Sequence, residues 1–256
     1  SVRVTGTRFD HEMIRTLRGP YAGSGTARRI THPSASKRGL LDTMTEPGAE
    51  PAPLTVGVTG HRAVRLHGMN LPLLTSRIRA ALTALDLPPA GSELSPVADG
   101  ADQIVARAAV ALGCRLACVL PFPRHDYLAD FPTAAGKAEY NALLSLAECV
   151  IELDGSTATP EDRDRAYVAV GAYTVEHCDM LLAIWDGRRA RGSGGTAQVV
   201  DAALGVGRPV VWISSAPPHT VSILVSNGRG AVTEHPLDDD PLQLRALIAS
   251  GNWNRS

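Results

Sequence analysis

The stretch DMLLAIWDGRRARGSGGTAQVVDAAL, residues 179–204, contains the pattern that decides the fold. An apolar run typical of a buried strand ends at Asp186, a loop rich in arginine and glycine follows, and a helical pattern begins at about Thr196. The loop glycines, Gly192, Gly194 and Gly195, can adopt positive φ angles and let backbone amides approach a bulky anion. The following helix adds about half a positive charge at its N-terminus. The stretch therefore predicts a strand, an anion-binding loop and a helix, with an ordinary tight turn as the alternative interpretation.

Strand and helix patterns alternate in the same way from residue 54 to residue 214. The strands are apolar on both faces, which is typical of a largely parallel sheet covered by helices on both sides. We therefore expect an α/β, Rossmann-like three-layer sandwich. The expected strands are 54–60, 93–99, 115–122, 149–153, 179–186 and 208–214, and the expected helices are 71–85, 101–113, 133–148, 160–178 and 196–206.

The two ends of the chain differ from this central domain, residues 54–214. Residues 1–53 are rich in Arg, Ser, Thr and Gly without a sustained period, so we expect a mostly disordered extension or linker. One hypothesis is that Met44 is the natural start of the protein and that the preceding residues are a fragment or an extension. Residues 215–256 contain a candidate edge strand at 230–235 and a candidate closing helix at 240–250, which we expect to pack on the same domain.

The charge balance is close to neutral, with 25 Lys plus Arg against 26 Asp plus Glu. No global field therefore attracts the chain to nucleic acid or to a membrane, and any anion site must be local. The cysteines lack zinc-site spacing, which favours buried thiols in a cytoplasmic protein. No run approaches the roughly 18 apolar residues of a membrane span. We expect no membrane partner, no metal and no nucleic-acid partner.

Three segments place glycines where a predicted strand leads into a helix, and these ends meet at one edge of a parallel sheet. They are VGVTGHR at 56–62, VADGADQ at 97–103 and the loop before Thr196. Phosphate is the anion that suits this arrangement best. The predicted ligand-binding residues are Thr59, Gly60, His61, Arg62, Asp99, Gly100, Ala101, Asp102, Pro121, Asp186, Gly194, Gly195 and Thr196.

Individual side chains suggest roles at this edge. Arg62 can clamp a phosphate, and Asp99 and Asp102 can accept ribose hydroxyls, although capping of the following helix explains Asp102 equally well. Trp185 can stack on a base or simply cover the sheet. At most one of Tyr167 and Tyr173 is expected to meet a ligand, because they lie six residues apart on one helix. Residues 121–127 are a candidate lid.

The usual catalytic motifs are missing from the sequence. There is no G-x-S-x-G elbow, no G-x-x-x-x-G-K-[ST] loop, no H-E-x-x-H and no G-x-G-x-x-G after a strand. We therefore assign no catalytic residue and no specific cofactor.

The three glycine segments, in this order and over about residues 54–214, resemble the SLOG superfamily. This Rossmann-like group includes DNA-processing protein A, the Lonely Guy phosphoribohydrolases and bacterial nucleotide-sensing domains. The resemblance implies that a nucleotide or nucleotide-derived ligand binds at the strand ends. It further implies a sensor in bacterial signalling or defence, a homo-oligomer, and an effector encoded as a separate polypeptide.

The hydrolase branch of this superfamily carries P-G-G-x-G-T-x-x-E, with a glutamate that contributes to cleavage of the N-glycosidic bond. In this sequence Arg191 stands in place of the proline, Ser193 in place of the second glycine, and Val199 in place of the glutamate. Valine cannot exchange a proton, so the resemblance favours binding over hydrolysis. Hydrolysis of nucleoside monophosphates is one alternative. Binding of single-stranded DNA, as in DNA-processing protein A, is a second, which the near-neutral charge disfavours.

Overall fold

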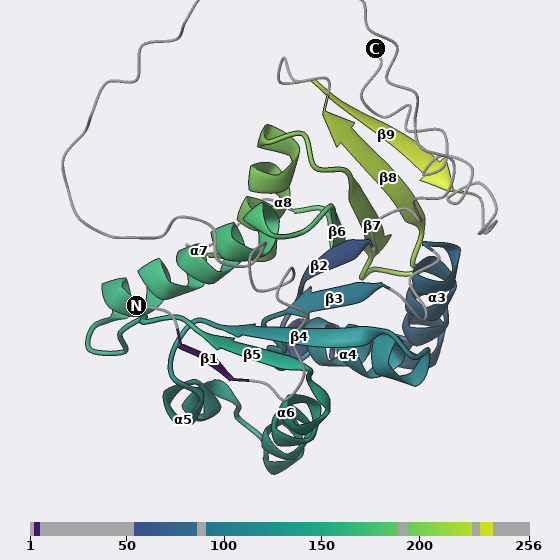
Figure 1. Cartoon of the computed structure of the whole chain (residues 1–256). Coiled ribbons are helices and arrows are strands. Elements are labelled where there is room, and N and C mark those ends of the chain that lie inside the picture. The colour runs from purple at the N-terminus through teal and green to yellow at the C-terminus, as the bar shows by residue number, and fades with distance from the viewer. Residues whose placement is uncertain (1–2, 6–53, 86–90, 189–193, 227–230, 238–256) are drawn as a thin grey trace, which may run out of the picture.

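The structure is a computed structural model that describes residues 3–5, 54–85, 91–188, 194–226 and 231–237 (Figure 1). Within these residues, nine strands form one sheet in the order β1-β5-β4-β3-β2-β6-β7-β8-β9. The strands from β5 to β7 in this order run parallel, and β1, β8 and β9 are antiparallel to their neighbours. The strands are β1 (Arg3–Thr5), β2 (Thr55–Gly60), β3 (Ser92–Ser95), β4 (Arg115–Leu120), β5 (Cys149–Glu152), β6 (Met180–Trp185), β7 (Val210–Ser214), β8 (Val221–Ser226) and β9 (Val232–Leu237).

Helices cover both faces of this sheet, as Figure 1 shows. The faces alternate along β6, where Leu182 and Ile184 pack with α3 and α4, whereas Leu181 and Ala183 pack with α8. All these side chains are buried, which explains why the strand has no polar face. The helices are α2 (Ala63–Leu66), α3 (Leu71–Ala84), α4 (Ala101–Ala111), α5 (Arg124–Tyr127), the 3₁₀ turn η1 (Leu128–Asp130), α6 (Ala134–Leu146), α7 (Pro160–Glu176) and α8 (Thr196–Gly205). The predicted α/β, Rossmann-like three-layer fold is confirmed.

The strand order reverses between β2 and β6. The chain adds β3, β4 and β5 on one side of β2 and then returns to add β6 and β7 on the other side. In open parallel sheets, such a reversal opens a crevice beyond the carboxyl ends of the two strands, because the following loops leave toward opposite faces. The fold therefore places a ligand crevice at the ends of β2 and β6.

Several elements differ from the sequence prediction. The strand expected at 93–99 ends at Ser95, because Pro96 has no N–H to donate to the sheet. β8 was not predicted, and it lies between β7 and β9. Residues 3–5 form an edge strand on β5 inside the segment expected to be disordered, so that expectation is wrong for them. The rest of 1–53 and the helix expected at 240–250 lie outside the described residues.

The helix N-termini fall into two groups. Thr159 caps α7 and Thr133 caps α6, because each side chain accepts a hydrogen bond from an amide of the first turn. α4 and α8 instead begin after Gly100 and Gly195, which provide no capping side chain. The starts of α4 and α8 lie at the carboxyl edge of the sheet, so first-turn amides there need other partners.

Candidate functional site

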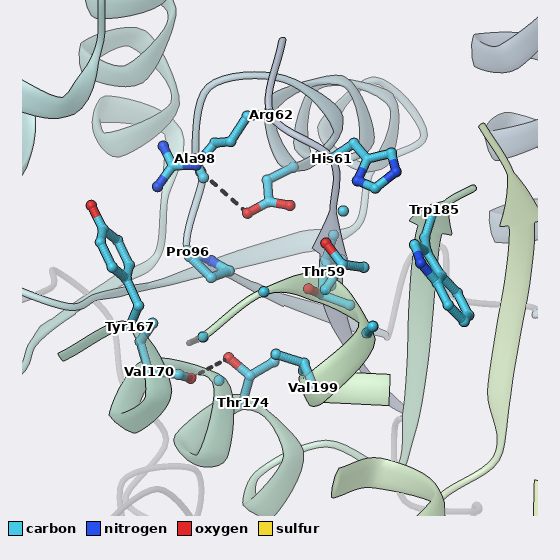
Figure 2. Close-up of a pocket in the computed structure, with 18 of the residues that line it drawn as sticks. Thr59, His61, Arg62, Pro96, Ala98, Tyr167, Val170, Thr174, Trp185 and Val199 are labelled. Carbon is cyan, nitrogen blue, oxygen red and sulfur yellow. Dashed lines mark hydrogen bonds between the residues drawn. The ribbon is translucent and has the colours of Figure 1, made fainter. Parts of the chain in front are cut away.

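A pocket of about 210 Å³ lies at the carboxyl ends of β2 and β6, at the predicted crevice (Figure 2). Arg62 and Tyr167 lie on one side of it and Trp185 on the other, with Thr59 and Pro96 between them. Its walls come from β2, the β3–α4 loop, α4, α5, α7, the end of β6 and the start of α8. The residues that line it are Val58, Thr59, Gly60, His61, Arg62, Arg65, Pro96, Ala98, Asp102, Tyr127, Tyr167, Val170, Gly171, Thr174, Trp185, Arg188, Gly194, Gly195, Thr196, Ala197 and Val199.

The structure brings together residues from all three segments that the sequence predicted. Thr59, Gly60, His61, Arg62, Asp102, Gly194, Gly195 and Thr196 line the pocket. The other predicted residues lie outside its lining, and they are Asp99, Gly100, Ala101, Pro121 and Asp186. The lining residues left out of the prediction include Tyr127 of α5 and four residues of α7, which reach the pocket from other parts of the sequence.

Backbone hydrogen bonds join the first two glycine segments to each other. The amide of Ala101 donates to the carbonyl of His61 (3.0 Å), and the amide of Ala63 donates to the carbonyl of Asp99 (3.1 Å). A Cβ on Gly60 would lie 2.4 Å from the Cβ of Ala101, and Gly100, at φ +118°, has no room for one. These glycines therefore allow two loops to pack closely, and the amides of Ala63 and Ala101 are bonded within the protein rather than left for a ligand.

The third segment, before Thr196, keeps a glycine with a positive φ angle and amides that face the pocket without an acceptor among the described residues. Gly194 adopts a φ of +72°, and a Cβ there would lie 2.5 Å from the Cβ of Tyr167. Gly195 has a φ of −78°, which any residue can adopt, so only the first of these glycines needs the predicted conformation. The amide of Gly194 donates to the side chain of Gln198. Among the described residues, the first-turn amides of Thr196 and Ala197 have no acceptor, and both residues line the pocket.

Asp186 belongs to the wall behind the pocket. Its carboxylate accepts a hydrogen bond from the Arg65 guanidinium (2.8 Å) and another from the amide of Arg188 (3.1 Å). Burial raises the pKa of Asp186, and these bonds and the charges of His61 and Arg65 more than offset that effect, so its pKa lies below the ordinary value. The prediction that Asp186 contacts the ligand is not supported, because its oxygens already hold the two loops together.

His61 joins the same two loops. Its ring is buried, and Nε2 lies 3.2 Å from the amide nitrogen of Asp186, which donates to it. Burial lowers the pKa of His61, and the charge of Arg65 lowers it further against the opposing effect of Asp186. Nε2 also lies 3.3 Å from Oδ1 of Asp186. The ring therefore contacts both the backbone and the side chain of Asp186 and positions the end of β2 against the end of β6.

Asp102 is the most unusual side chain of the pocket, because it is a carboxyl group with only 4% of its surface exposed. Its Oδ2 accepts a hydrogen bond from the amide of Ala98 (3.3 Å), which the dashed line from Ala98 marks in Figure 2. Its Oδ1 is buried and has no hydrogen-bond partner among the described residues. Burial raises the pKa of Asp102 to about 7, although the nearby charge of Arg62 opposes this effect.

The two acidic residues predicted to accept ribose hydroxyls, Asp99 and Asp102, lie in different places. Asp99 precedes α4 but lies along a different groove, between α4 and α6, where its Oδ1 would be 2.9 Å from a Cβ on Gly136. Sequence distance could not separate these candidates, because the loop turns between them at Gly100. Pro121 also lies elsewhere, with its carbonyl against Gly155.

Only one of the two candidate tyrosines of α7 reaches the pocket, as their spacing along the helix predicts. Tyr167 lines the pocket, with the Arg62 guanidinium 5.6 Å from its ring centroid, whereas Tyr173 stacks on His177 away from it. Trp185 both lines the pocket and covers the sheet, because its ring packs 5.4 Å from that of Trp212. The end of the candidate lid contributes Tyr127, whose hydroxyl interacts with Arg62.

Val199, which stands where the hydrolase motif has its glutamate, also lines the pocket, and its side chain is apolar and nearly buried.

In the part of the chain that the structure describes, no group of three or more His, Cys, Asp or Glu is arranged to hold a metal ion. No helix within the described ranges is long and apolar enough to cross a membrane. All four cysteines are buried and unpaired, as the sequence predicted.

Strand order and pocket position together define a Rossmann-like α/β protein with its crevice at the reversal point. No protein-family model and no curated protein matches this chain. It is similar to the solved structure of DNA processing protein A from Streptococcus pneumoniae, with a TM-score of 0.46 and 17% identity over 78% of this chain. This match covers 57% of the Streptococcus pneumoniae chain, so the present chain corresponds to little more than half of that protein.

A second similar structure is DNA processing protein A from Helicobacter pylori, described for its single-stranded DNA binding mode. The TM-score is 0.45 and the identity 13%, over 66% of this chain and 68% of that one. The nucleotide-sensing branch of the superfamily stays a prediction.

Proposed function

We propose that the pocket binds a nucleotide or a nucleotide-derived small molecule, with its phosphate at the start of α8. The observation that carries the proposal is the convergence of unlike groups on one pocket. The first-turn amides of Thr196 and Ala197, which have no acceptor among the described residues, and the guanidinium of Arg62 suit an anion. The buried oxygen of Asp102 that lacks a partner among the same residues suits a donor. A phosphate joined to a hydroxylated sugar supplies both.

The size of the pocket limits how much of such a ligand is enclosed. Its volume of about 210 Å³ is below the roughly 300 Å³ at the lower end of sites for drug-sized ligands. A phosphate with its sugar suits this space, and the base would then extend beyond it. The proposal therefore gives the pocket a strong preference for the phosphate and sugar and a weaker one for the base.

Binding without turnover is the form of the proposal that the walls favour. Val199 cannot transfer a proton, and the neutral ring of His61 is held by the amide of Asp186. We therefore propose a sensor rather than a hydrolase of nucleoside monophosphates. Chromatographic analysis of AMP after incubation with the protein tests this choice, because release of the free base would restore the hydrolase alternative.

Thermal unfolding in the presence of nucleotides, ADP-ribose derivatives and cyclic nucleotides tests the binding proposal. A ligand at one hundred times its Kd should stabilise the protein by about 2.7 kcal/mol. Arg62→Ala should weaken binding at least about tenfold, since it removes a charged hydrogen-bond donor. Arg79→Ala is the matched control, because Arg79 is an exposed arginine of α3 on another groove. Equal binding by both variants, or no shift with any ligand, would refute the proposal.

Single-stranded DNA is a second candidate ligand, because the Helicobacter pylori DNA processing protein A binds it. The exposed side chain of Arg188 at the rim offers a cation for a phosphate of such a strand. A labelled oligonucleotide titrated at two salt concentrations separates the candidates. Affinity for DNA that falls steeply with salt and is not reduced by the mononucleotide would favour DNA. Displacement of the oligonucleotide by the mononucleotide would favour the pocket ligand.

Signalling completes the proposal. A sensor in bacterial signalling or defence would transmit binding to a separately encoded effector or through a change of oligomeric state. Size-exclusion chromatography with light scattering, with and without the stabilising nucleotide, tests the second route. A mass that is the same in both samples would exclude a ligand-driven assembly.

A further inference from the structure

Only one of the two carboxyl oxygens of Asp102 has a hydrogen-bond partner among the described residues. A residue near the start of a helix commonly caps a first-turn amide, but Oδ2 of Asp102 accepts instead from Ala98, which precedes α4. Oδ1 is buried without a partner among the described residues, and Asp102 is one of the residues that line the pocket. A buried polar atom without a hydrogen bond destabilises a protein, so this oxygen indicates a donor that arrives with a ligand.

We propose that Oδ1 of Asp102 accepts a hydrogen bond from a ribose hydroxyl, so that the pocket selects ribonucleotides over phosphate alone and over DNA. This inference rests on the proposed nucleotide-binding function and names the part of the ligand that is read. It also makes Asp102 a specificity-determining residue of the pocket.

The groups around Asp102 support an acceptor role. The Arg62 guanidinium, which interacts with Tyr127 and lies over the ring of Tyr167, supplies a positive charge that favours the carboxylate form. The amide of Ala98 fixes the orientation of the carboxyl group, so Oδ1 is held in one direction.

A sugar hydroxyl is the donor that fits best. The pocket is too small to enclose the base together with the phosphate, so the donors nearest to a bound phosphate are the hydroxyls of its own sugar. A ribonucleotide offers hydroxyls at both C2′ and C3′. Within a DNA strand the sugar lacks the first, and the second is esterified, so an internal deoxynucleotide presents no sugar donor to Asp102.

Isothermal titration calorimetry at pH 8 with AMP, 2′,3′-dideoxy-AMP and inorganic phosphate tests the inference. The wild type should bind AMP about 10- to 100-fold more tightly than dideoxy-AMP, since a hydrogen bond to a charged acceptor is lost. Asp102→Asn should lose a similar factor for AMP and should bind AMP and dideoxy-AMP nearly equally. Asp99→Asn is the matched control, because Asp99 follows the same strand but lines a different groove, and it should behave as wild type.

The outcomes separate the two proposals. If AMP binds and Asp102→Asn binds it as tightly as wild type, the inference is wrong and the proposed function stands. If Asp102→Asn weakens inorganic phosphate as much as AMP, the carboxyl group acts on the phosphate site rather than on the sugar, and the inference is also wrong. If neither AMP nor any other nucleotide of the thermal panel binds, the proposed function itself fails. Because dideoxy-AMP is measured on the wild type, the test holds even if Asp102→Asn does not fold.

Discussion

Replacing Asp102 with asparagine should stabilise the ligand-free protein at neutral and alkaline pH. The carboxyl group is nearly fully buried, and one of its oxygens has no partner among the described residues. Ionising it therefore places a poorly compensated charge in the interior. Asparagine keeps the shape and can still accept the hydrogen bond from the amide of Ala98, but it carries no charge.

The magnitude follows from the pKa of Asp102, which burial raises from 3.8 to about 7. Between these values the unfolded chain has released the proton and the folded protein has not, so the free energy of unfolding falls as the pH rises. A difference of about three pKa units at about 1.4 kcal/mol each corresponds to a loss of up to about 4 kcal/mol. This loss is complete above about pH 7 and is absent below about pH 4.

Urea denaturation between pH 4 and pH 9 measures this effect. The free energy of unfolding of Asp102→Asn should exceed that of the wild type by a gap that grows up to about pH 7 and then stays constant. Burial and the charge of Asp102 both raise the pKa of Glu93, so Asp102→Asn also relieves Glu93 and widens the gap in the same direction. A gap that does not change with pH, or one that grows toward acid, would refute the reasoning.

Three further changes test the fold around the pocket, each by urea denaturation. Gly100→Ala should destabilise the protein by about 2 kcal/mol or more, because the residue has a φ of +118° and its Cβ would lie 2.4 Å from the amide of Ala63; an effect below about 0.5 kcal/mol would contradict this close approach. Gly195→Ala should change stability by less than about 1 kcal/mol, since its φ of −78° suits any residue, and a larger loss would mean that the loop needs glycine there. Burial raises the pKa of Glu152, but hydrogen bonds from the amide and guanidinium of Arg124 more than offset this and leave it lowered. Glu152→Gln should therefore cost about 1 kcal/mol at pH 7 and progressively less as the pH falls below the ordinary carboxyl range, and a cost that persists at pH 2 would exclude the ionic contribution.

The arrangement of strands and helices could be predicted from the sequence because it depends on local patterns. A strand that is apolar on both faces, such as Met180–Trp185, must lie inside a covered parallel sheet whatever its neighbours are. The carboxyl ends of such strands share one edge, so Arg62, Asp102 and Thr196 could be assigned to one region. β8 was missed although it continues the same sheet.

The sequence by itself determined the layers of this protein, the edge at which its loops gather and the residue types available there. Only the tertiary structure decided which groups remain free for a ligand. The amide of Ala101 is taken up by the carbonyl of His61, and Asp186 is taken up by Arg65, whereas Oδ1 of Asp102 is left without a partner among the described residues. The physical reason is that a hydrogen bond between distant segments depends on how closely their backbones approach, and no local pattern carries that distance.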